Sequence, residues 1–183
     1  MILVRHAAVA IDSKVPAERW KLSQTGVEQA AAVGARLAEY KPSIVIASEA
    51  PKASETGQLI AERLGVKLET RPGLQEHDRS NEPFALSEED WHAKMKRLFA
   101  EPDALVYGTE TATAARERFA AAVATCPEDA VIVAHGTVIT LFVAQHNPVE
   151  PFAFWEGFVP AAWVQLAAGF RCDPTSEACI QLG

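Results

Sequence analysis

The chain has 183 residues, of which 49% are hydrophobic and 22% charged, and its formal net charge is −7. These values are typical of one soluble globular domain, and we expect residues 1–183 to form a single domain. The negative charge disfavours nucleic acid and anionic membranes as partners, and no apolar stretch approaches the length of about 18 residues that spans a bilayer. A site for an anionic substrate would therefore need a local cluster of cations.

The first half of the sequence alternates short apolar runs with longer segments of helical period. Ser23 is a good N-cap for the first helix, whose apolar face we place at Val27, Ala30 and Ala31 and the residues one turn on. Pro51 suits the first turn of the second helix. The expected elements are strands at 2–5, 43–48 and 66–71, and helices at 23–40 and from Pro51 to about Leu64.

The second half begins with a polar loop and ends with two strands. Ser87, followed by three acidic residues, is a strong helix start. The aromatic segment 151–163 is either an edge of the core or an interface. The expected elements are a loop at 75–86, helices from Ser87, at about 110–125 and at 138–145, and strands at 130–134, 161–168 and 178–182.

The order of these elements predicts an α/β fold. Strands that alternate with helices form a mostly parallel sheet covered on both faces, which gives a three-layer α/β/α sandwich. The last two strands have no helix between them, so we expect an antiparallel closing strand pair. In such sheets ligands bind beyond the carboxyl ends of the strands, where His6 and His135 both stand.

His6 and His135 each end a buried strand, where an ionisable ring costs more than an apolar side chain. Arg5 precedes His6, and Lys52 lies at the start of a helix, where free N–H groups favour anions. Two cations, two histidines and a helix start at one edge predict a pocket for a dianion such as a phosphoryl group. The role of His77, in the polar loop, stays open.

Six segments in order resemble the histidine phosphatase superfamily, the relatives of cofactor-dependent phosphoglycerate mutase. They are "LVRHA", "LSQTGVEQA", "ASEAPKASET", "LQE", "YGTET" and "VIVAHGT", and they span most of residues 2–140. The pairing of an RH segment with an HG segment, with "LSxxGxxQA" between them, makes this resemblance specific.

The resemblance implies a two-step phosphoryl transfer without a metal or another cofactor. His6 would be the nucleophile and form a phosphohistidine, with its other ring nitrogen held by a hydrogen bond. Arg5, Lys52 and His135 would bind the phosphoryl oxygens, and His135 would also act in catalysis. Glu76 would serve as proton donor, with Asp78 as the alternative for that role.

The sequence departs from the family pattern at three places. Ala7 stands where a glycine is usual, and Lys52 stands where an arginine is common, which keeps the charge but loses the planar fork. Asp12 replaces a residue that usually lies near the phosphate, so we expect its carboxylate to point elsewhere or to meet a cationic part of the substrate. Substrate contacts are expected from residues 8–21, including Arg19 and Lys21, and from the 75–86 loop, including Arg79.

These features favour a metal-independent phosphomonoesterase that acts on a small phosphorylated substrate, with a phosphoprotein as an open alternative. The other functions that we keep are a phosphate-binding module with little turnover, a phosphoglycerate mutase-like transferase, and a metallohydrolase using His6, His77, Asp78 and His135. The short chain favours hydrolysis over transfer.

The N-terminus and the cysteines favour a cytoplasmic protein. The first residues, "MILV", are typical of a strand and lack the features of a signal peptide. Cys126, Cys172 and Cys179 have no metal-type spacing. Free thiols are expected in a reducing compartment, and a Cys172–Cys179 disulfide is the alternative. The sequence does not indicate an oligomeric state.

Overall fold

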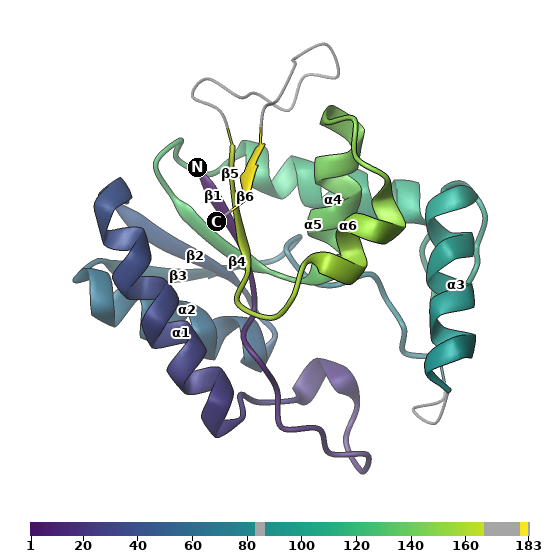
Figure 1. The fold of residues 1–183 in the computed structure, drawn as a ribbon, viewed down its shortest axis with the longest axis horizontal. Helices are drawn as coiled ribbons and strands as arrows, with labels where there is room; N and C mark the ends of the chain where they lie inside the picture. Colours follow the sequence, from purple (N-terminus) through teal and green to yellow (C-terminus); the bar gives the residue numbers. More distant parts are fainter. Residues whose placement is uncertain (83–86, 167–179, 183) are drawn as a thin grey trace.

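A computed structural model of the chain describes residues 1–82, 87–166 and 180–182. Its strands are β1 (Ile2–Arg5), β2 (Ile44–Ser48), β3 (Lys67–Arg71), β4 (Val131–Ala134), β5 (Trp163–Leu166) and β6 (Ile180–Leu182). Its α-helices are α1 (Gln24–Leu37), α2 (Pro51–Leu64), α3 (Glu88–Ala100), α4 (Ala112–Ala124), α5 (Gly136–His146) and α6 (Pro151–Gly157) (Figure 1). Short 3-10 helices cover Ala17–Arg19 and Ala38–Tyr40.

The strands form one mixed sheet in the order β3-β2-β4-β1-β5-β6. The first four strands of this order are parallel, whereas β5 runs antiparallel to β1 and to β6. Helices α1 and α2 cover one face, and α4, α5 and α6 cover the other (Figure 1). The predicted three-layer fold with an antiparallel closing pair is therefore confirmed.

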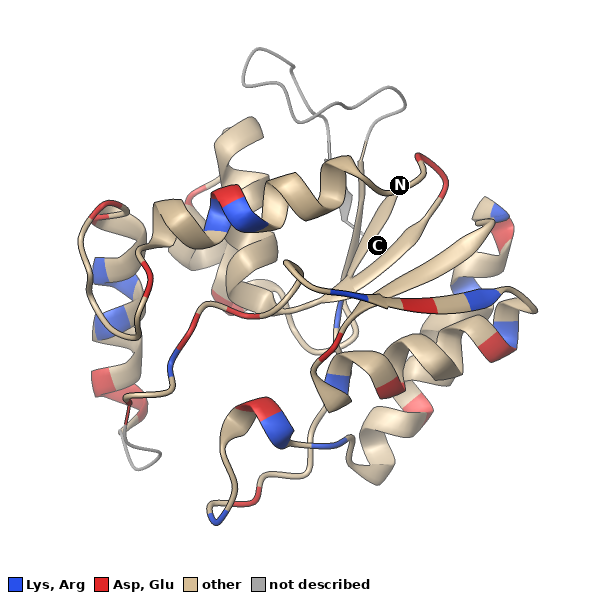
Figure 2. Cartoon of the chain, turned by 180° about the vertical axis from the view of Figure 1, so that it is seen from behind, with Lys and Arg blue, Asp and Glu red and all other residues tan. Residues whose placement is uncertain are grey.

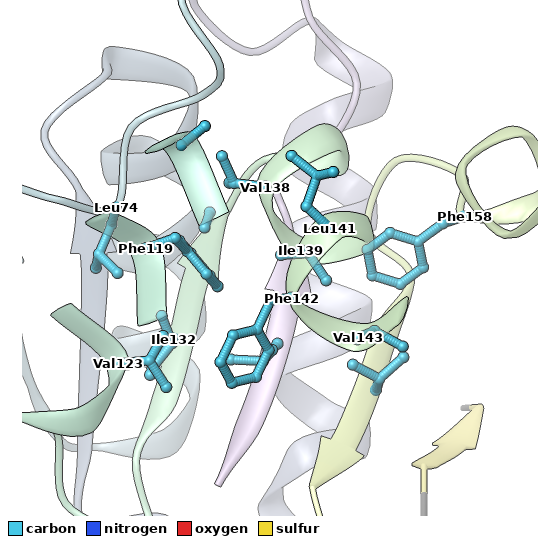
Figure 3. Packing of buried hydrophobic residues seen from close by; sticks show 14 of the residues in the cluster. Leu74, Phe119, Val123, Ile132, Val138, Ile139, Leu141, Phe142, Val143 and Phe158 are labelled. Atoms are coloured by element: carbon cyan, nitrogen blue, oxygen red, sulfur yellow. The ribbon is translucent and has the colours of Figure 1, made fainter. Parts of the chain in front are cut away.

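Alternating side chains of the central strands feed two separate cores. Leu3 and Ile132 face α4 and α5, where the rings of Phe119 and Phe142 meet edge to face with centroids 5.6 Å apart (Figure 3). Ile2, Val4, Val131 and Val133 face α1 and α2 instead, and pack with Ala30 and Ile60. Both faces of β1 and β4 are buried, so these strands firmly support the residues that follow them, His6 and His135.

Helix α1 begins as predicted but buries a different set of residues. The Ser23 hydroxyl accepts a hydrogen bond from the N–H of Gly26, as an N-cap does. The buried face runs through Gly26, Ala30, Val33, Gly34 and Leu37, whereas Val27 and Ala31 are exposed. The buried face differs from the predicted one because Gly26 packs directly on the backbone of Ala8, after β1.

One helix begins earlier than predicted, and another was not predicted at all. Helix α5 begins at Gly136, directly after His135, rather than at residue 138. The aromatic segment 151–163 contains α6, whose first turn is capped by the carboxylate of Glu150 and has Pro151 at its start. This segment belongs to the core, since Phe158 and Trp163 are buried. No helix was predicted in this segment from the sequence.

Most charged side chains lie on the loops, on the helices and on the edge strand β3 (Figure 2). Among the described central strands, only β1 carries a charged residue, Arg5 at its carboxyl end. None of the helices in these ranges is long and apolar enough to span a membrane. Cys126 is a half-buried free thiol, whereas Cys172 and Cys179 lie outside the described residues.

Candidate active site

The two sequence-predicted histidines lie side by side at the carboxyl edge of the sheet. Strands β1 and β4 are adjacent and parallel, and their register pairs Arg5 with Ala134. His6 and His135 therefore leave the sheet at the same level, and their ring centroids are 5.2 Å apart. The N–H of His6 also donates to the carbonyl of Ala134, which continues the ladder into the site.

The ring of His6 is held as a neutral tautomer with Nε2 unprotonated. Its Nδ1 lies 2.9 Å from the carbonyl oxygen of Ala7, and because a carbonyl only accepts, Nδ1 carries the hydrogen. Burial, and secondly the positive charge of Lys52, lower the pKa of His6 to about 3. The lone pair on Nε2 is thus available at neutral pH, which a nucleophile requires.

His135 is fully buried and stands at the N-cap of α5. Its Nε2 is 3.0 Å from the hydroxyl of Ser48 at the end of β2, and its Nδ1 has no partner among the described residues. Burial is the main cause that lowers its pKa well below the usual value, and the positive charge of Lys52 acts in the same direction. A buried polar atom without a partner beside His6 is a natural contact for a ligand oxygen.

Arg5 is fixed by the segment that leads into β5. Its backbone N–H donates to the carbonyl of Ala162 at 2.9 Å, and its guanidinium donates to the carbonyl of Phe158. Burial lowers its pKa, although the charge of Glu76 opposes that effect. A Cβ added at Gly136 would lie 3.2 Å from Nε of Arg5, so any larger residue there would press on the guanidinium.

Lys52 connects the start of α2 to the loop after β1. Its ammonium donates to the carbonyl of Ala17 at 3.0 Å and lies 5.8 Å from the ring centre of Trp20. The side chain is 8% exposed, and burial lowers its pKa, with the Glu76 charge acting in the other direction. Lysine thus provides a buried charge at this position and also holds residues 17–20 over the site.

The "LSQTGVEQA" segment positions the backbone that follows His6. The N–H of Ala8 donates to the side chain of Gln29 at 3.0 Å, and its carbonyl accepts from the N–H of Ser23. A Cβ on Gly26 would lie 2.0 Å from that carbonyl oxygen. The motif is therefore explained by close contact between α1 and the loop after β1.

The departures at Ala7 and Asp12 have local explanations. Among the described non-glycine residues only Lys41 and Ala161 have positive φ, so residue 7 needs no glycine backbone. The buried N–H of Ala7 donates to the hydroxyl of Thr56 at 3.0 Å. The Asp12 carboxylate accepts from the N–H of Lys14 in its own turn and lines neither of the cavities beside His6 and His135, in agreement with one of the two alternatives predicted.

Glu76 and Asp78, the two candidate proton donors, have different environments. The Glu76 carboxylate accepts N–H bonds from Thr137 and Val138 at the start of α5, at 3.1 and 3.2 Å, which brings it beside His135. Burial alone would raise the pKa of Asp78, but hydrogen bonds from Thr109 and Ser80 outweigh it and lower that pKa. Asp78 is therefore committed to the loop as a carboxylate.

The predicted residues line two adjoining cavities. Arg5, His6, Lys52 and Glu76 line one of about 180 Å³, and Lys52, Glu76 and His135 also line a neighbouring one of about 350 Å³. Arg79 lines both and stacks 4.4 Å above Trp91, whereas Arg19 and Lys21 are exposed and line neither. The cations and the histidines thus line two adjoining cavities at the sheet edge, and Lys52 and Glu76 line both.

His77 contributes to both cavities but is 1% exposed, and its ring packs on Tyr107 with centroids 4.6 Å apart. His92 and His146 line neither cavity. In the described ranges no group of three or more His, Cys, Asp or Glu side chains is arranged to hold a metal ion.

Sequence reasoning missed the residues that support the loop carrying Glu76 and Asp78, which we call the acidic loop. Arg118, in the middle of α4, donates to backbone carbonyls of this loop and lines the larger cavity. Gly108 has φ of 73°, and a Cβ there would lie 1.8 Å from the carbonyl oxygen of Asp78. The "YGTET" segment hinted at Gly108, but nothing in the helical pattern distinguished Arg118.

The chain resembles known proteins in family pattern and in fold. Residues 1–169 match the model of the histidine phosphatase superfamily (branch 1). No curated protein matches the chain significantly in sequence. A mycobacterial glucosyl-3-phosphoglycerate phosphatase superposes with a TM-score of 0.72 at 20% identity, covering 100% of this chain and 95% of that one.

A phosphoserine phosphatase from Entamoeba histolytica, solved with 3-phosphoglyceric acid, superposes with a TM-score of 0.74 at 16% identity. The superposition covers 99% of this chain and 94% of that one. At these identities the likeness shows the fold alone, whereas the family match extends over nearly the whole sequence, including both histidine segments. The chain therefore belongs to the histidine phosphatase superfamily, branch 1.

Proposed function

We propose that the protein is a metal-independent phosphomonoesterase that acts through a phosphohistidine on His6. The observation that carries this proposal is the tautomer of His6, whose Nδ1–H donates to the Ala7 carbonyl and leaves the Nε2 lone pair for attack. The lowered pKa keeps this ring neutral over the physiological range. Membership of the histidine phosphatase superfamily supports the same reaction class.

In the first step the Nε2 lone pair of His6 attacks phosphorus, and the bond from phosphorus to the ester oxygen breaks. The electron pair leaves with that oxygen, which takes a proton from Glu76, so the products are a neutral alcohol and phosphohistidine. Arg5, Lys52 and the unpartnered Nδ1 of His135 bind the phosphoryl oxygens.

In the second step water attacks the phosphohistidine. Glu76 accepts a proton from this water, the bond between phosphorus and nitrogen breaks, and its electron pair returns to the ring of His6. Inorganic phosphate leaves, and both residues regain their starting protonation states. The cavity of about 350 Å³ next to the catalytic pocket provides space for the alcohol portion and for water.

The substrate proposed is a small phosphorylated molecule. The structural relatives named above are phosphatases of glucosyl-3-phosphoglycerate and of phosphoserine. The catalytic pocket has a volume of about 180 Å³, below the roughly 300–1,000 Å³ of sites for drug-sized ligands, which favours a small substrate. A phosphoprotein is the second candidate for the same chemistry.

The test is hydrolysis of p-nitrophenyl phosphate by the wild type and by His6→Ala, each with and without a chelator. We expect wild-type turnover that survives the chelator and a loss of about 10⁴-fold or more in kcat on removal of the nucleophile. Alkaline quench of the wild type during turnover, which preserves the acid-labile phosphohistidine, should trap a phosphorylated protein, and His6→Ala should not incorporate phosphate.

Each alternative function has its own outcome in this experiment. Loss of turnover with the chelator would favour the metallohydrolase and overturn the metal-free mechanism. Vanadate binding without turnover on any phosphomonoester would favour the binding module. Preferential transfer of the phosphoryl group to an added alcohol over water would favour the mutase-like transferase.

A further inference from the structure

The guanidinium of Arg118 makes a hydrogen bond with each of its five N–H donors. Nη1 donates to the carbonyls of Gly73 and Gln75, both at 2.9 Å, and Nη2 donates to that of Glu76 at 3.3 Å. The other Nη2–H and the Nε–H go to the two carboxylate oxygens of Glu110, at 2.7 and 3.2 Å. Arg118 therefore has no donor left for a substrate anion, although it lines the larger cavity.

Glu110 extends the same contact to the far side of Glu76. Its Oε1 also accepts the N–H of Asp78 at 3.1 Å. Arg118 thus holds the carbonyls of Gly73, Gln75 and Glu76, and Glu110 holds the N–H of Asp78. Both side chains are about one-fifth exposed, so water screens this ion pair only partly.

We propose that Arg118, with Glu110, is a positioning residue that fixes the Glu76 carboxyl at the leaving oxygen of the substrate. This inference rests on the proposed function, in which Glu76 donates the proton. The Glu76 carboxylate reaches α5 only if its backbone stays at the present distance, because its partners on that helix are the N–H groups of Thr137 and Val138. A lysine at 118 has three donors and no planar fork, so it cannot keep all five contacts.

A displaced proton donor has a specific kinetic signature. Protonation of the leaving oxygen matters most when that oxygen is strongly basic and matters little when it is weakly basic. Phenyl phosphate and p-nitrophenyl phosphate carry the same phosphoryl group, but phenolate is the much stronger base. A variant with a misplaced Glu76 should therefore lose activity on phenyl phosphate and largely keep it on p-nitrophenyl phosphate.

The experiment compares kcat/KM on these two substrates for the wild type, Arg118→Lys, Glu110→Gln and Arg116→Lys. We expect Arg118→Lys to lose about 100-fold on phenyl phosphate and only a few-fold on p-nitrophenyl phosphate. Glu110→Gln should change the ratio in the same direction, since the amide keeps one acceptor oxygen but adds a donor. Arg116→Lys is the matched control, because Arg116 lies on the same helix and donates outward to Gln145 at 2.7 Å.

A cycle with Glu76→Gln completes the test. Once the proton donor is absent, Arg118→Lys should change neither substrate much further. Equal losses on both substrates, or no loss at all, would overturn the positioning role while leaving the phosphatase proposal intact. If Arg118→Lys does not unfold cooperatively, Glu110→Gln decides the question. A wild type inactive on both substrates would overturn the proposed function and this inference with it.

Discussion

The nucleophile side and the acid side of the site are built in different ways. Arg5 and His6 continue a buried central strand, and both make backbone hydrogen bonds to neighbouring segments, to Ala162 and Ala134. Glu76 lies instead in a loop that is held by side chains of α4 and by the start of α5. Sheet hydrogen bonds hold the first group, whereas long side chains and one glycine hold the second. The acid side should therefore be the easier one to disturb without unfolding the protein.

The largest effect that separates the two sides is expected from Gly108→Ala. The new Cβ would lie 1.8 Å from the Asp78 carbonyl oxygen, in a backbone conformation that already disfavours side chains. We expect a loss of about 4 kcal/mol or more in unfolding free energy, together with a large loss of turnover. Because Arg5, His6 and Lys52 come from other elements, vanadate affinity should stay close to that of the wild type.

Gly65→Ala is the matched control for this variant. Gly65 has φ of 70°, almost the same as Gly108, but nothing lies within 4 Å of its added Cβ. Urea denaturation should show a loss of only about 1–2 kcal/mol, from backbone strain alone. Equal losses for the two variants would mean that the close contact with Asp78 does not hold the acidic loop.

The same difference explains what the sequence could and could not predict. His6, Lys52 and His135 were predictable because each follows a recognisable strand, and parallel strands deliver their ends to one edge. Arg118 was not, because its contacts lie about 40 residues away in the chain and its helix has an ordinary charged pattern. The contacts of Arg5 with the segment at Phe158 were hidden for the same reason.

The next effect concerns acid stability and belongs to the nucleophile side. The pKa of His6 is about 3 when folded, below its ordinary value of 6.5, so the unfolded chain binds the extra proton first. The contribution of neutral His6 to the free energy of unfolding is fully present above pH 6.5. It falls by about 1.4 kcal/mol for each pH unit below 6.5, until the pKa of His6 in the folded protein is reached. Urea titrations at pH 7, 6 and 5 should show a shallower loss for His6→Gln than for the wild type. Identical slopes would contradict a neutral buried His6.

A smaller effect is expected from Gly136→Ala, in which the added Cβ displaces only the Arg5 side chain, on the nucleophile side. The added Cβ would lie 3.2 and 3.3 Å from Nε and Cζ of Arg5, so the guanidinium must move by a few tenths of an ångström. We expect about a tenfold loss in kcat/KM for p-nitrophenyl phosphate and for phenyl phosphate alike, because the phosphoryl contact serves both. Gly34→Ala, at a similarly tight contact between α1 and α2, should lower stability without this kinetic change.

The smallest effect is expected from Ser48→Ala. The Ser48 hydroxyl is the partner of His135 Nε2 at 3.0 Å, and both groups are buried. Its removal leaves a buried ring nitrogen unpaired, which costs about 1 kcal/mol of stability, and loosens the orientation of His135. We expect the looser orientation of His135 to lower kcat/KM about fivefold. Ser43→Ala, just before the same strand and exposed, should match the wild type in both measurements. A fivefold loss confined to phenyl phosphate would instead place His135 with Glu76 on the acid side.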